Sequence, residues 1–240
     1  MIPVFLCFDK SLQYYVSHVY NSVKLNTYDD IEFHVIITSD VSDICVQDYH
    51  HAGIIVHRVD LPDINVNPNG IVRSPAMFLR WLIPSFTEHK RAIYLDNDVI
   101  VTGNIADMFN RRMGNNLIAA VKDKWATCVC HTTHHQGTIP DALHLPSFYS
   151  GQLVINCEAW HAEGIANRLF DVVKKYNVLD MIALNYVCAG RITELAPEWC
   201  VSAAYDEVPR NAKLLHWHGR TKPWDKNCLN KNYYDMYTRG

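Results

Sequence analysis

Two carboxylates, one residue apart, interrupt an otherwise apolar segment in the middle of the chain. The segment reads Arg91-Ala92-Ile93-Tyr94-Leu95-Asp96-Asn97-Asp98-Val99-Ile100-Val101. Because burying a charge is costly, two acids have no place inside a buried strand, and we expect the pair at the strand's end. Divalent cations such as Mn²⁺ and Mg²⁺ prefer carboxylate oxygens. Asp96 and Asp98 are therefore candidate metal ligands, although an Asp-x-Asp tripeptide alone also fits a pair of turn acids.

A second unusual segment lies near the C-terminus and reads His216-Trp217-His218-Gly219-Arg220-Thr221-Lys222-Pro223-Trp224. The imidazole of His216 adds a nitrogen ligand, and mixed imidazole and carboxylate coordination suits Mn²⁺ better than an all-oxygen Mg²⁺ site. Lys222 and the backbone around Gly219 would neutralise phosphate oxygens. Together the two segments predict a clamp for a metal ion and a diphosphate.

The elements that position these residues follow from the spacing of the apolar side chains. The first third alternates strands and helices, which predicts a parallel or mixed sheet with helices on its faces. Ligands of such sheets gather beyond the carboxyl ends of the strands, where the Asp-x-Asp falls. The predicted strands are 4–8, 33–38, 53–59, 93–95, 117–121 and 153–156, and the predicted helices are 12–25, 76–86, 160–176 and 181–187.

Size and charge limit the class of protein. With 240 residues, 49% of them hydrophobic, the chain can bury a substantial core, and we expect one continuous domain over 1–240. The net charge of -3 and the pI near 6.5 argue against a nucleic-acid partner. The apolar N-terminal run is too short for a signal peptide or a membrane span, so we expect a cytoplasmic protein with reduced cysteines. The aromatic and basic C-terminal residues 231–239 allow at most peripheral contact with the inner face of a membrane.

An ordered set of motifs extends over nearly the whole chain. The motifs are Cys7-Phe8-Asp9, Phe78-Leu79-Arg80, Tyr94-Leu95-Asp96-Asn97-Asp98, Ser150-Gly151-Gln152-Leu153-Val154-Ile155-Asn156, Asp180-Met181-Ile182-Ala183-Leu184-Asn185, Leu195-Ala196-Pro197-Glu198-Trp199 and the segment from His216 to Trp224. In this order they resemble glycosyltransferase family 8, the retaining GT-A enzymes. The resemblance implies an α/β GT-A fold, a single Rossmann-like nucleotide-diphospho-sugar transferase domain with a mixed central sheet. Its nucleotide-binding half would be 1–100, and its acceptor-side half 101–240.

The resemblance also implies an activity and roles for residues. The activity is transfer of a hexose from a UDP-sugar to a glycan, glycolipid or other hydroxyl acceptor, with retained anomeric configuration, as in polysaccharide biosynthesis. Mn²⁺, or alternatively Mg²⁺, would be held by Asp96, Asp98 and His216. The implied donor contacts are Phe8, Asp9, Arg80, Asp96, Asn97, Asp98, His216, Gly219 and Lys222, and the implied catalytic residues are Asp180, Arg80 and Asp98.

The charges expected at the site suit the chemistry of such a transfer. The metal ion and Lys222 would stabilise the negative charge that builds on the UDP leaving group as the sugar becomes oxocarbenium-like. In a front-face mechanism the acceptor hydroxyl attacks from the side that the diphosphate leaves. The departing phosphate oxygen then accepts the proton, and no protein nucleophile is required.

Four positions depart from the family pattern. Met181 stands where the family has Gln, so an amide carbonyl oxygen is missing there. Ile182 replaces the second acid of that motif, Tyr149 stands where Asn is usual, and Leu12 stands where an aromatic often stacks on uracil. These departures leave the identity of the transferred sugar open.

Two other functions remain as alternatives. A non-catalytic nucleotide-sugar binding module would explain Met181 and Ile182. An aspartyl phosphohydrolase would use Asp96 as its nucleophile, but Ile100 stands where that chemistry needs a hydroxyl.

Two further signals are set aside. A zinc site among Cys128, Cys130 and the histidines up to His135 is disfavoured, because the gap between the cysteines is tighter than usual. We expect Trp125 and Trp160 to be packing residues rather than sugar platforms.

Overall fold

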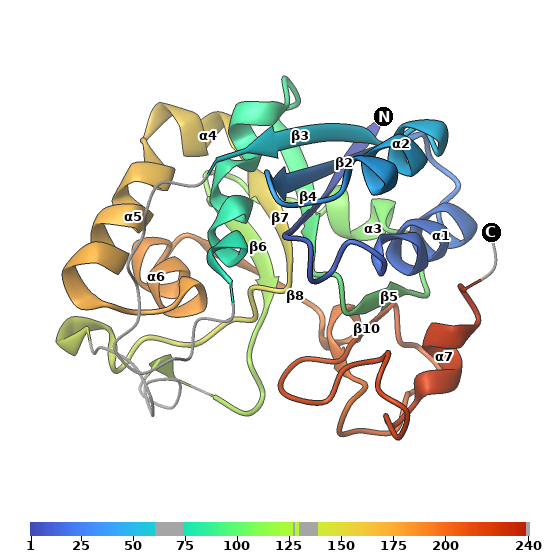
Figure 1. The fold of residues 1–240 in the computed structure, drawn as a ribbon. Coiled ribbons are helices and arrows are strands. Elements are labelled where there is room, and N and C mark those ends of the chain that lie inside the picture. Colours follow the sequence, from blue (N-terminus) through green and yellow to red (C-terminus); the bar gives the residue numbers. More distant parts are fainter. Residues whose placement is uncertain (61–73, 127, 130–138, 239–240) are drawn as a thin grey trace.

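The computed structural model describes residues 1–60, 74–126, 128–129 and 139–238, and it contains a large and a small β-sheet (Figure 1). The large sheet has seven strands in the order β3-β2-β1-β4-β7-β6-β8. Its strands are β1 (Ile2–Phe8), β2 (Ile31–Thr38), β3 (Ile55–Val59), β4 (Arg91–Leu95), β6 (Ile118–Val121), β7 (Gln152–Asn156) and β8 (Ile192–Leu195). β1 pairs in parallel with both β2 and β4, whereas β7 runs antiparallel to β4 and β6. The sheet is therefore mixed, as the sequence predicts.

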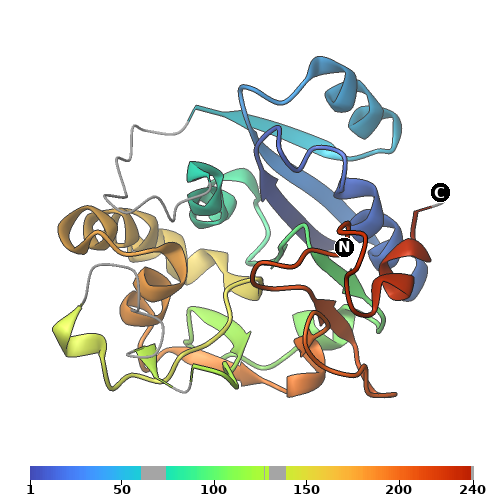
Figure 2. The ribbon, with the colours of Figure 1, turned by 60° about the horizontal axis from the view of Figure 1, so that its bottom comes forward.

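Both faces of the sheet are covered, which explains why its strands are nearly continuous apolar runs. Along β1, Val4, Leu6 and Phe8 belong to one buried core, and Phe5 and Cys7 belong to a second core on the other face. Figures 1 and 2 show α1 to α3 on one side of the sheet and α4 to α6 on the other. Because successive side chains of a strand point to opposite faces of the sheet, one apolar run contributes to both cores.

Each predicted helix has a helical segment at its position in the structure, but some boundaries differ from the prediction. The helix predicted at 160–176 is two helices, α4 and α5, because Gly164 turns the chain between them with a positive φ of 59°. The helix predicted from residue 12 begins only at Val16, because Ser11 donates from its backbone N–H to Asp9 Oδ1 (2.8 Å) and the chain forms turns there. The helices are α1 (Val16–Asn26), α2 (Asp43–His51), α3 (Ala106–Phe109), α4 (Cys157–Ala162), α5 (Ile165–Tyr176), α6 (Asp180–Val187), α7 (Lys231–Asp235) and the 3₁₀ segments η1 (Pro75–Phe86), η3 (Pro140–Ala142) and η4 (Pro197–Trp199).

The small sheet has three strands in the order β5-β10-β9, formed by Val99–Val101, Leu214–His216 and Val201–Ser202. β5 and β10 are antiparallel, with His216 opposite Val99. β9 runs parallel to β10, with Ser202 opposite His216. This sheet joins the segment that follows the Asp-x-Asp to the C-terminal motif, which lies more than a hundred residues further along the chain.

The last helix returns to the first. The side-chain amide of Asn21 donates to the Tyr237 carbonyl (3.0 Å), and that of Asn26 donates to the Tyr237 hydroxyl (2.9 Å). Figures 1 and 2 both show α7 beside α1. No helix within the described ranges is long and apolar enough to cross a membrane.

The cysteines agree only in part with the expectation of reduced thiols. Six are free and buried, namely Cys7, Cys45, Cys157, Cys188, Cys200 and Cys228. Cys128, however, takes part in a disulfide. The predicted segment from Cys128 to His135 falls largely outside the described residues.

Candidate active site

The site lies where the order of the sheet reverses. From β1 the chain winds outward through β2 to β3 and then returns to place β4 on the other side of β1. Asp9 follows the last residue of β1, and Asp96 follows the last residue of β4. Because these two neighbouring strands are parallel, both acids lie at the same edge, which is where α/β sheets bind ligands.

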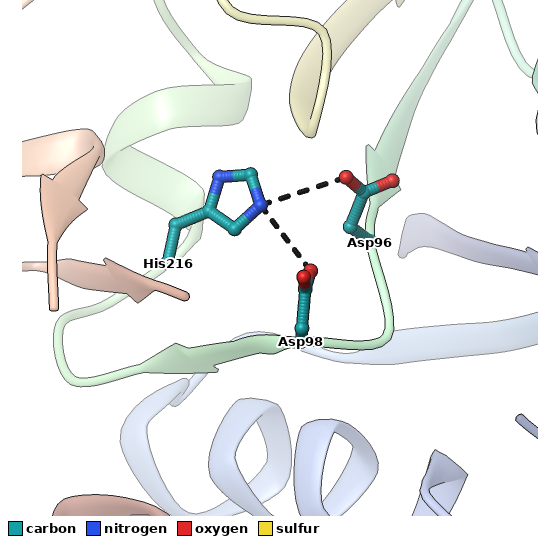
Figure 3. Close-up of side chains that lie close together, drawn as sticks. All are labelled: Asp96, Asp98 and His216. Atoms are coloured by element: carbon teal, nitrogen blue, oxygen red, sulfur yellow. Dashed lines mark ion pairs between the residues drawn. The ribbon is translucent and has the colours of Figure 1, made fainter. Parts of the chain in front are cut away.

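Asp96, Asp98 and His216 form a compact triad (Figure 3). His216 Nε2 lies 3.2 Å from Asp98 Oδ1 and 3.6 Å from Asp96 Oδ2. One ligand atom from each residue falls within 4.8 Å of the other two. The β5–β10 register explains the meeting, because it places His216 opposite Val99, next to Asp98. The backbone N–H of Trp217 also donates to the Asp98 carbonyl (3.0 Å).

The triad fits a divalent cation in its chemistry and in the space around it. Two carboxylates and one imidazole form a donor set that suits Mn²⁺. Gly151 lies against the triad, and a Cβ at this position would be 2.3 Å from His216 Cε1 and 2.7 Å from Asp96 Oδ2. Any side chain at Gly151 would therefore collide with two of the three ligands. The structure thus provides both the ligands and a space that a larger residue would fill.

Buried charges hold the triad in place. Burial would raise the pKa of Asp98, but His216 and then Lys222 lower it far below its usual value. Burial would likewise lower the pKa of His216, but the Asp98 carboxylate raises it to about 10. Lys222 Nζ lies 2.5 Å from Asp98 Oδ2. The Asp98 carboxylate therefore pairs with both the His216 imidazolium and the Lys222 ammonium.

Arg80 connects the triad to the next acid. It is 7% exposed, and its guanidinium lies 3.2 Å from Asp96 Oδ1 and 3.4 Å from Asp180 Oδ2. The guanidinium also donates to the carbonyls of Met77 (2.9 Å) and Ser150 (2.7 Å). These four contacts fix Arg80 between the two carboxylates, so it is a rigid cation facing the site.

Two neighbours complete the surroundings of Arg80. The ring of Tyr94 lies beneath its guanidinium, 4.4 Å from ring centroid to Cζ, and the Tyr94 hydroxyl donates to Asp96 Oδ1. Ser150 Oγ donates to Asp180 Oδ2 (3.4 Å). Burial raises the pKa of Asp180 above its usual value, although Arg80 opposes this effect.

Two pockets meet at the triad. The first, here called the strand-end pocket, has a volume of about 440 Å³ and opens at the ends of β1 and β4. The second, here called the aromatic pocket, has a volume of about 670 Å³ and extends past Trp125 and Tyr205. Both are lined by Met77, Arg80, Asp96, Asp98 and Lys222. A ligand that spans the two pockets would therefore have its middle at the triad.

Each site residue predicted from the sequence lines one of these pockets. The strand-end pocket has Phe8, Asp9 and Asn97, the aromatic pocket has Asp180, His216 and Gly219, and both have Arg80, Asp96, Asp98 and Lys222. The buried side-chain nitrogen of Asn97 has no hydrogen-bond partner among the described residues. A buried donor of this kind needs a partner, which a bound ligand would provide.

Other residues of the site were not predicted. The expectation that Trp125 is a packing residue is wrong, since it is 59% exposed and lines the aromatic pocket. Trp160 does pack, being buried and donating from Nε1 to the Trp81 carbonyl (3.1 Å). Asp123, Tyr205 and His218 also line the aromatic pocket. No short motif marks Asp123 or Tyr205, which come from separate loops, and His218 stands at an unspecified position of the motif from His216 to Trp224.

The comparison with known families gives a clear result. A family model described as Glycosyl transferase family 8 matches residues 3–228. The chain belongs to glycosyltransferase family 8. The resemblance of the motifs is thereby confirmed.

Three of the curated relatives illustrate the similarity, and all three carry glycosyltransferase names. Glycosyltransferase GlyB of Streptococcus pneumoniae is 32% identical over 104 residues, which cover 43% of this chain and 22% of the relative. GlyE of the same organism is 27% identical over 167 residues, covering 62% of this chain and 37% of the relative. Glycosyltransferase 8 domain-containing protein 2 of Mus musculus is 26% identical over 202 residues, which cover 68% of this chain and 58% of the relative. The chain therefore spans only about a fifth to three fifths of the lengths of these relatives.

Solved structures show the same fold. An active-site mutant of LgtC superposes with a TM-score of 0.81 at 20% identity, covering 99% of this chain and 95% of that chain. The galactosyltransferase LgtC in complex with donor and acceptor sugar analogues superposes with a TM-score of 0.79 at 19% identity and the same coverage. The bifunctional glycosyltransferase WbbM superposes with a TM-score of 0.76 at 20% identity, covering 98% of this chain and 49% of that chain. The predicted GT-A fold with a mixed central sheet is thereby confirmed.

Proposed function

We propose that this family 8 protein is a retaining glycosyltransferase, which moves a hexose from a UDP-sugar to a hydroxyl acceptor and depends on Mn²⁺. The observation that carries the proposal is the Asp96, Asp98 and His216 triad at the junction of two pockets. A UDP-sugar has its diphosphate between a nucleoside and a sugar. The arrangement therefore matches a donor whose diphosphate lies at the triad.

The strand-end pocket would take the nucleoside. Phe8 and Asp9 lie at the end of β1, and hydrogen bonds from Ser11 and Ser74 keep the pKa of Asp9 low despite partial burial. An ionised carboxylate at this place accepts hydrogen bonds from a base N–H. This assignment makes residues 1–100 the nucleotide-binding half and 101–240 the acceptor-side half.

The triad and the two cations would take the diphosphate. When bound, Mn²⁺ held by Asp96, Asp98 and His216 would neutralise charge on the phosphate oxygens. Lys222 lies beside Asp98, and Arg80 beside Asp96, so both cations adjoin the same place. Fixed cations aimed at a leaving group stabilise the charge that it gains in the transition state. Backbone N–H groups near Gly219 would add to this effect.

The transfer would be a front-face displacement. The bond between the anomeric carbon and the diphosphate oxygen breaks, and the acceptor oxygen bonds to the same face of that carbon. The acceptor proton passes to the departing phosphate oxygen, so the products are the new glycoside and UDP. Arg80 and Asp180, held together by their ion pair, would hold the hydroxyl groups of the sugar. Met181 lines the aromatic pocket and offers no amide oxygen, which supports a mechanism without a protein nucleophile.

The binding-module alternative retains one observation in its favour. Met181 occupies the position of the family's Gln and faces the aromatic pocket. A protein of that kind would bind UDP without turnover. The phosphohydrolase alternative has less support, because the Tyr94 hydroxyl and Arg80 both engage Asp96 Oδ1, and Ile100 is fully buried in β5.

The test is release of UDP from a panel of UDP-sugars by the purified protein, with Mn²⁺ and with chelator. We expect metal-dependent UDP release from one sugar of the panel, in which water takes the sugar because no acceptor is added. NMR of the freshly released sugar should show a retained anomeric configuration. Tight UDP binding with no release from any donor would contradict the proposal and favour a binding module. A phosphoryl group on Asp96 would favour the phosphohydrolase.

A further inference from the structure

Two large aromatic side chains are exposed inside the aromatic pocket. Trp125 is 59% exposed and Tyr205 is 51% exposed, and both line the pocket that contains the triad. Their rings meet edge to face, with centroids 6.5 Å apart. Exposing this much aromatic surface in a concave site is unfavourable unless a ligand covers it. The two rings therefore indicate an apolar ligand surface.

The Trp125 ring is held in position by its neighbours. Asp123 Oδ1 accepts hydrogen bonds from the backbone N–H groups of Trp125 (2.8 Å) and Ala126 (2.9 Å), which fixes the turn. Lys124 Nζ lies 4.7 Å from the centroid of the indole and pairs with Asp206, the residue after Tyr205. This pair links the two aromatic segments and neutralises the lysine. The ring is thus positioned before any ligand arrives.

Tyr205 is positioned by a glycine of the C-terminal motif. A Cβ at Gly219 would be 2.4 Å from the Tyr205 hydroxyl oxygen, and Gly219 has a φ of +91°. The Tyr205 ring lies 5.5 Å from His218, and the His218 ring lies 5.4 Å from His216, between centroids. A continuous series of rings therefore leads from the triad to Trp125.

We propose that the acceptor is itself a pyranoside and that Trp125 and Tyr205 form an aromatic platform for it; this inference rests on the sugar transfer proposed above. The sugar ring stacks on the face of Trp125, and Tyr205, whose ring plane is turned 74° from the indole, borders the edge of the sugar. A pyranose has a face of C–H groups that is apolar and slightly positive. The face of an aromatic ring is negative, so the two attract each other as well as excluding water. A serine hydroxyl of a protein or a polyol phosphate offers no such face. The side chains of Asp123 and His218 in the same pocket offer hydrogen bonds to the hydroxyl groups of the sugar.

The first test compares kinetic constants for donor and acceptor. The variants Trp125→Ala and Tyr205→Ala should raise the KM for a glycoside acceptor about tenfold, while the KM for the UDP-sugar stays at the wild-type value. Trp125→Tyr and Tyr205→Phe keep an aromatic face and should restore most of the loss. Tyr28→Ala is the matched control, because Tyr28 is 93% exposed and lines neither pocket. An unchanged acceptor KM in both alanine variants would contradict the aromatic platform, but it would not contradict the proposed sugar transfer.

The second test does not need turnover. Saturation-transfer NMR with UDP and Mg²⁺, which avoids the paramagnetism of Mn²⁺, is recorded on methyl glycosides of glucose, galactose and N-acetylglucosamine. Glycerol 3-phosphate and a serine peptide serve as the competing classes. We expect saturation of the ring C–H protons of one glycoside, and its loss in Trp125→Ala. Saturation of the peptide or glycerol phosphate alone, or of no glycoside, overturns the inference. Absence of UDP release by the wild type contradicts the proposed function instead, and the NMR result still decides the platform.

Discussion

The strand-end pocket and the aromatic pocket share the triad but are built differently. The carboxylates Asp9 and Asp96 of the first follow the ends of buried parallel strands, so the sheet itself sets their places. Beyond the triad, the second is lined by residues of η1, of the start of α6 and of loops, and two of its loop aromatics, Trp125 and Tyr205, are more than half exposed. Under the proposed function, the sheet would fix the part of the site that acts on the diphosphate. The loops, which tolerate change more readily, would form the part that selects the acceptor.

Removing a triad carboxylate should have the largest effect, because it acts on the part that both pockets share. We expect Asp98→Ala to lower the rate of UDP release at least about a thousandfold, since it removes a candidate metal ligand and leaves His216 and Lys222 without their counterion. Steady-state UDP release measures the effect, and circular dichroism checks the fold. Asp107→Ala is the control, because Asp107 is an exposed partner of Lys213 outside both pockets. Full activity in Asp98→Ala would exclude the triad from the reaction.

Filling the space beside the triad tests the same region without removing a ligand. Gly151→Ala places a Cβ against His216 and Asp96, and we expect Mn²⁺ affinity to fall by about 10- to 100-fold. Titration calorimetry with Mn²⁺ measures this. Gly190→Ala is a matched control, because a Cβ at Gly190 would meet no described atom within 4 Å beyond its chain neighbours, and the positive φ there costs only local strain. Equal Mn²⁺ affinity in the two variants would show that Gly151 is not needed for the site.

A change at the strand-end pocket should separate donor from acceptor. We expect Asp9→Ala to raise the KM for the UDP-sugar about tenfold and to leave the KM for the acceptor unchanged, the reverse of the pattern expected for Trp125→Ala. Asp40→Ala is the control, since Asp40 also follows a parallel strand, β2, but lies outside both pockets. Effects of Asp9→Ala on both KM values would mean that the two pockets are not functionally separate.

The smallest effect concerns pH and stability in the metal-free protein. Burial lowers the pKa of His216, but Asp98 raises it from 6.5 to about 10. A pKa raised by folding adds stability that is complete below pH 6.5 and is lost as the pH rises toward 10. The melting temperature of the metal-free protein should therefore fall over this interval, and fall less in His216→Asn. Thermal melts in chelator measure both slopes, and equal slopes would contradict the His216 assignment.

Much of the strand-end pocket could be predicted from the sequence, because its residues interrupt apolar runs. The carboxylates Asp9 and Asp96 end recognisable strands, and period-two burial explains why those strands are apolar throughout. The pairing of β5 with β10 could not be predicted. Three-residue strands carry no usable period, and their pairing joins segments more than a hundred residues apart.

The aromatic pocket could be predicted less well, for a different reason. Trp125 looks like a core residue in the sequence, since large aromatics are usually buried. Only the folded chain places it beside Tyr205 and over the pocket that holds the triad. The helix predicted at 160–176 failed at Gly164, where a left-handed turn interrupts an otherwise helical pattern.

The β5–β10 ladder consists of only three residue pairs, yet it determines which side chains make up the candidate metal site. Side chains alternate between the two faces of a strand, so a slip of one residue would turn His216 away and bring Leu215 or Trp217 to its place. The site would then offer two carboxylates alone, an oxygen-only set that favours Mg²⁺ or Ca²⁺. The one nitrogen atom of the candidate metal site is thus supplied by the alignment of two short strands, and not by the Asp-x-Asp that first marks the site.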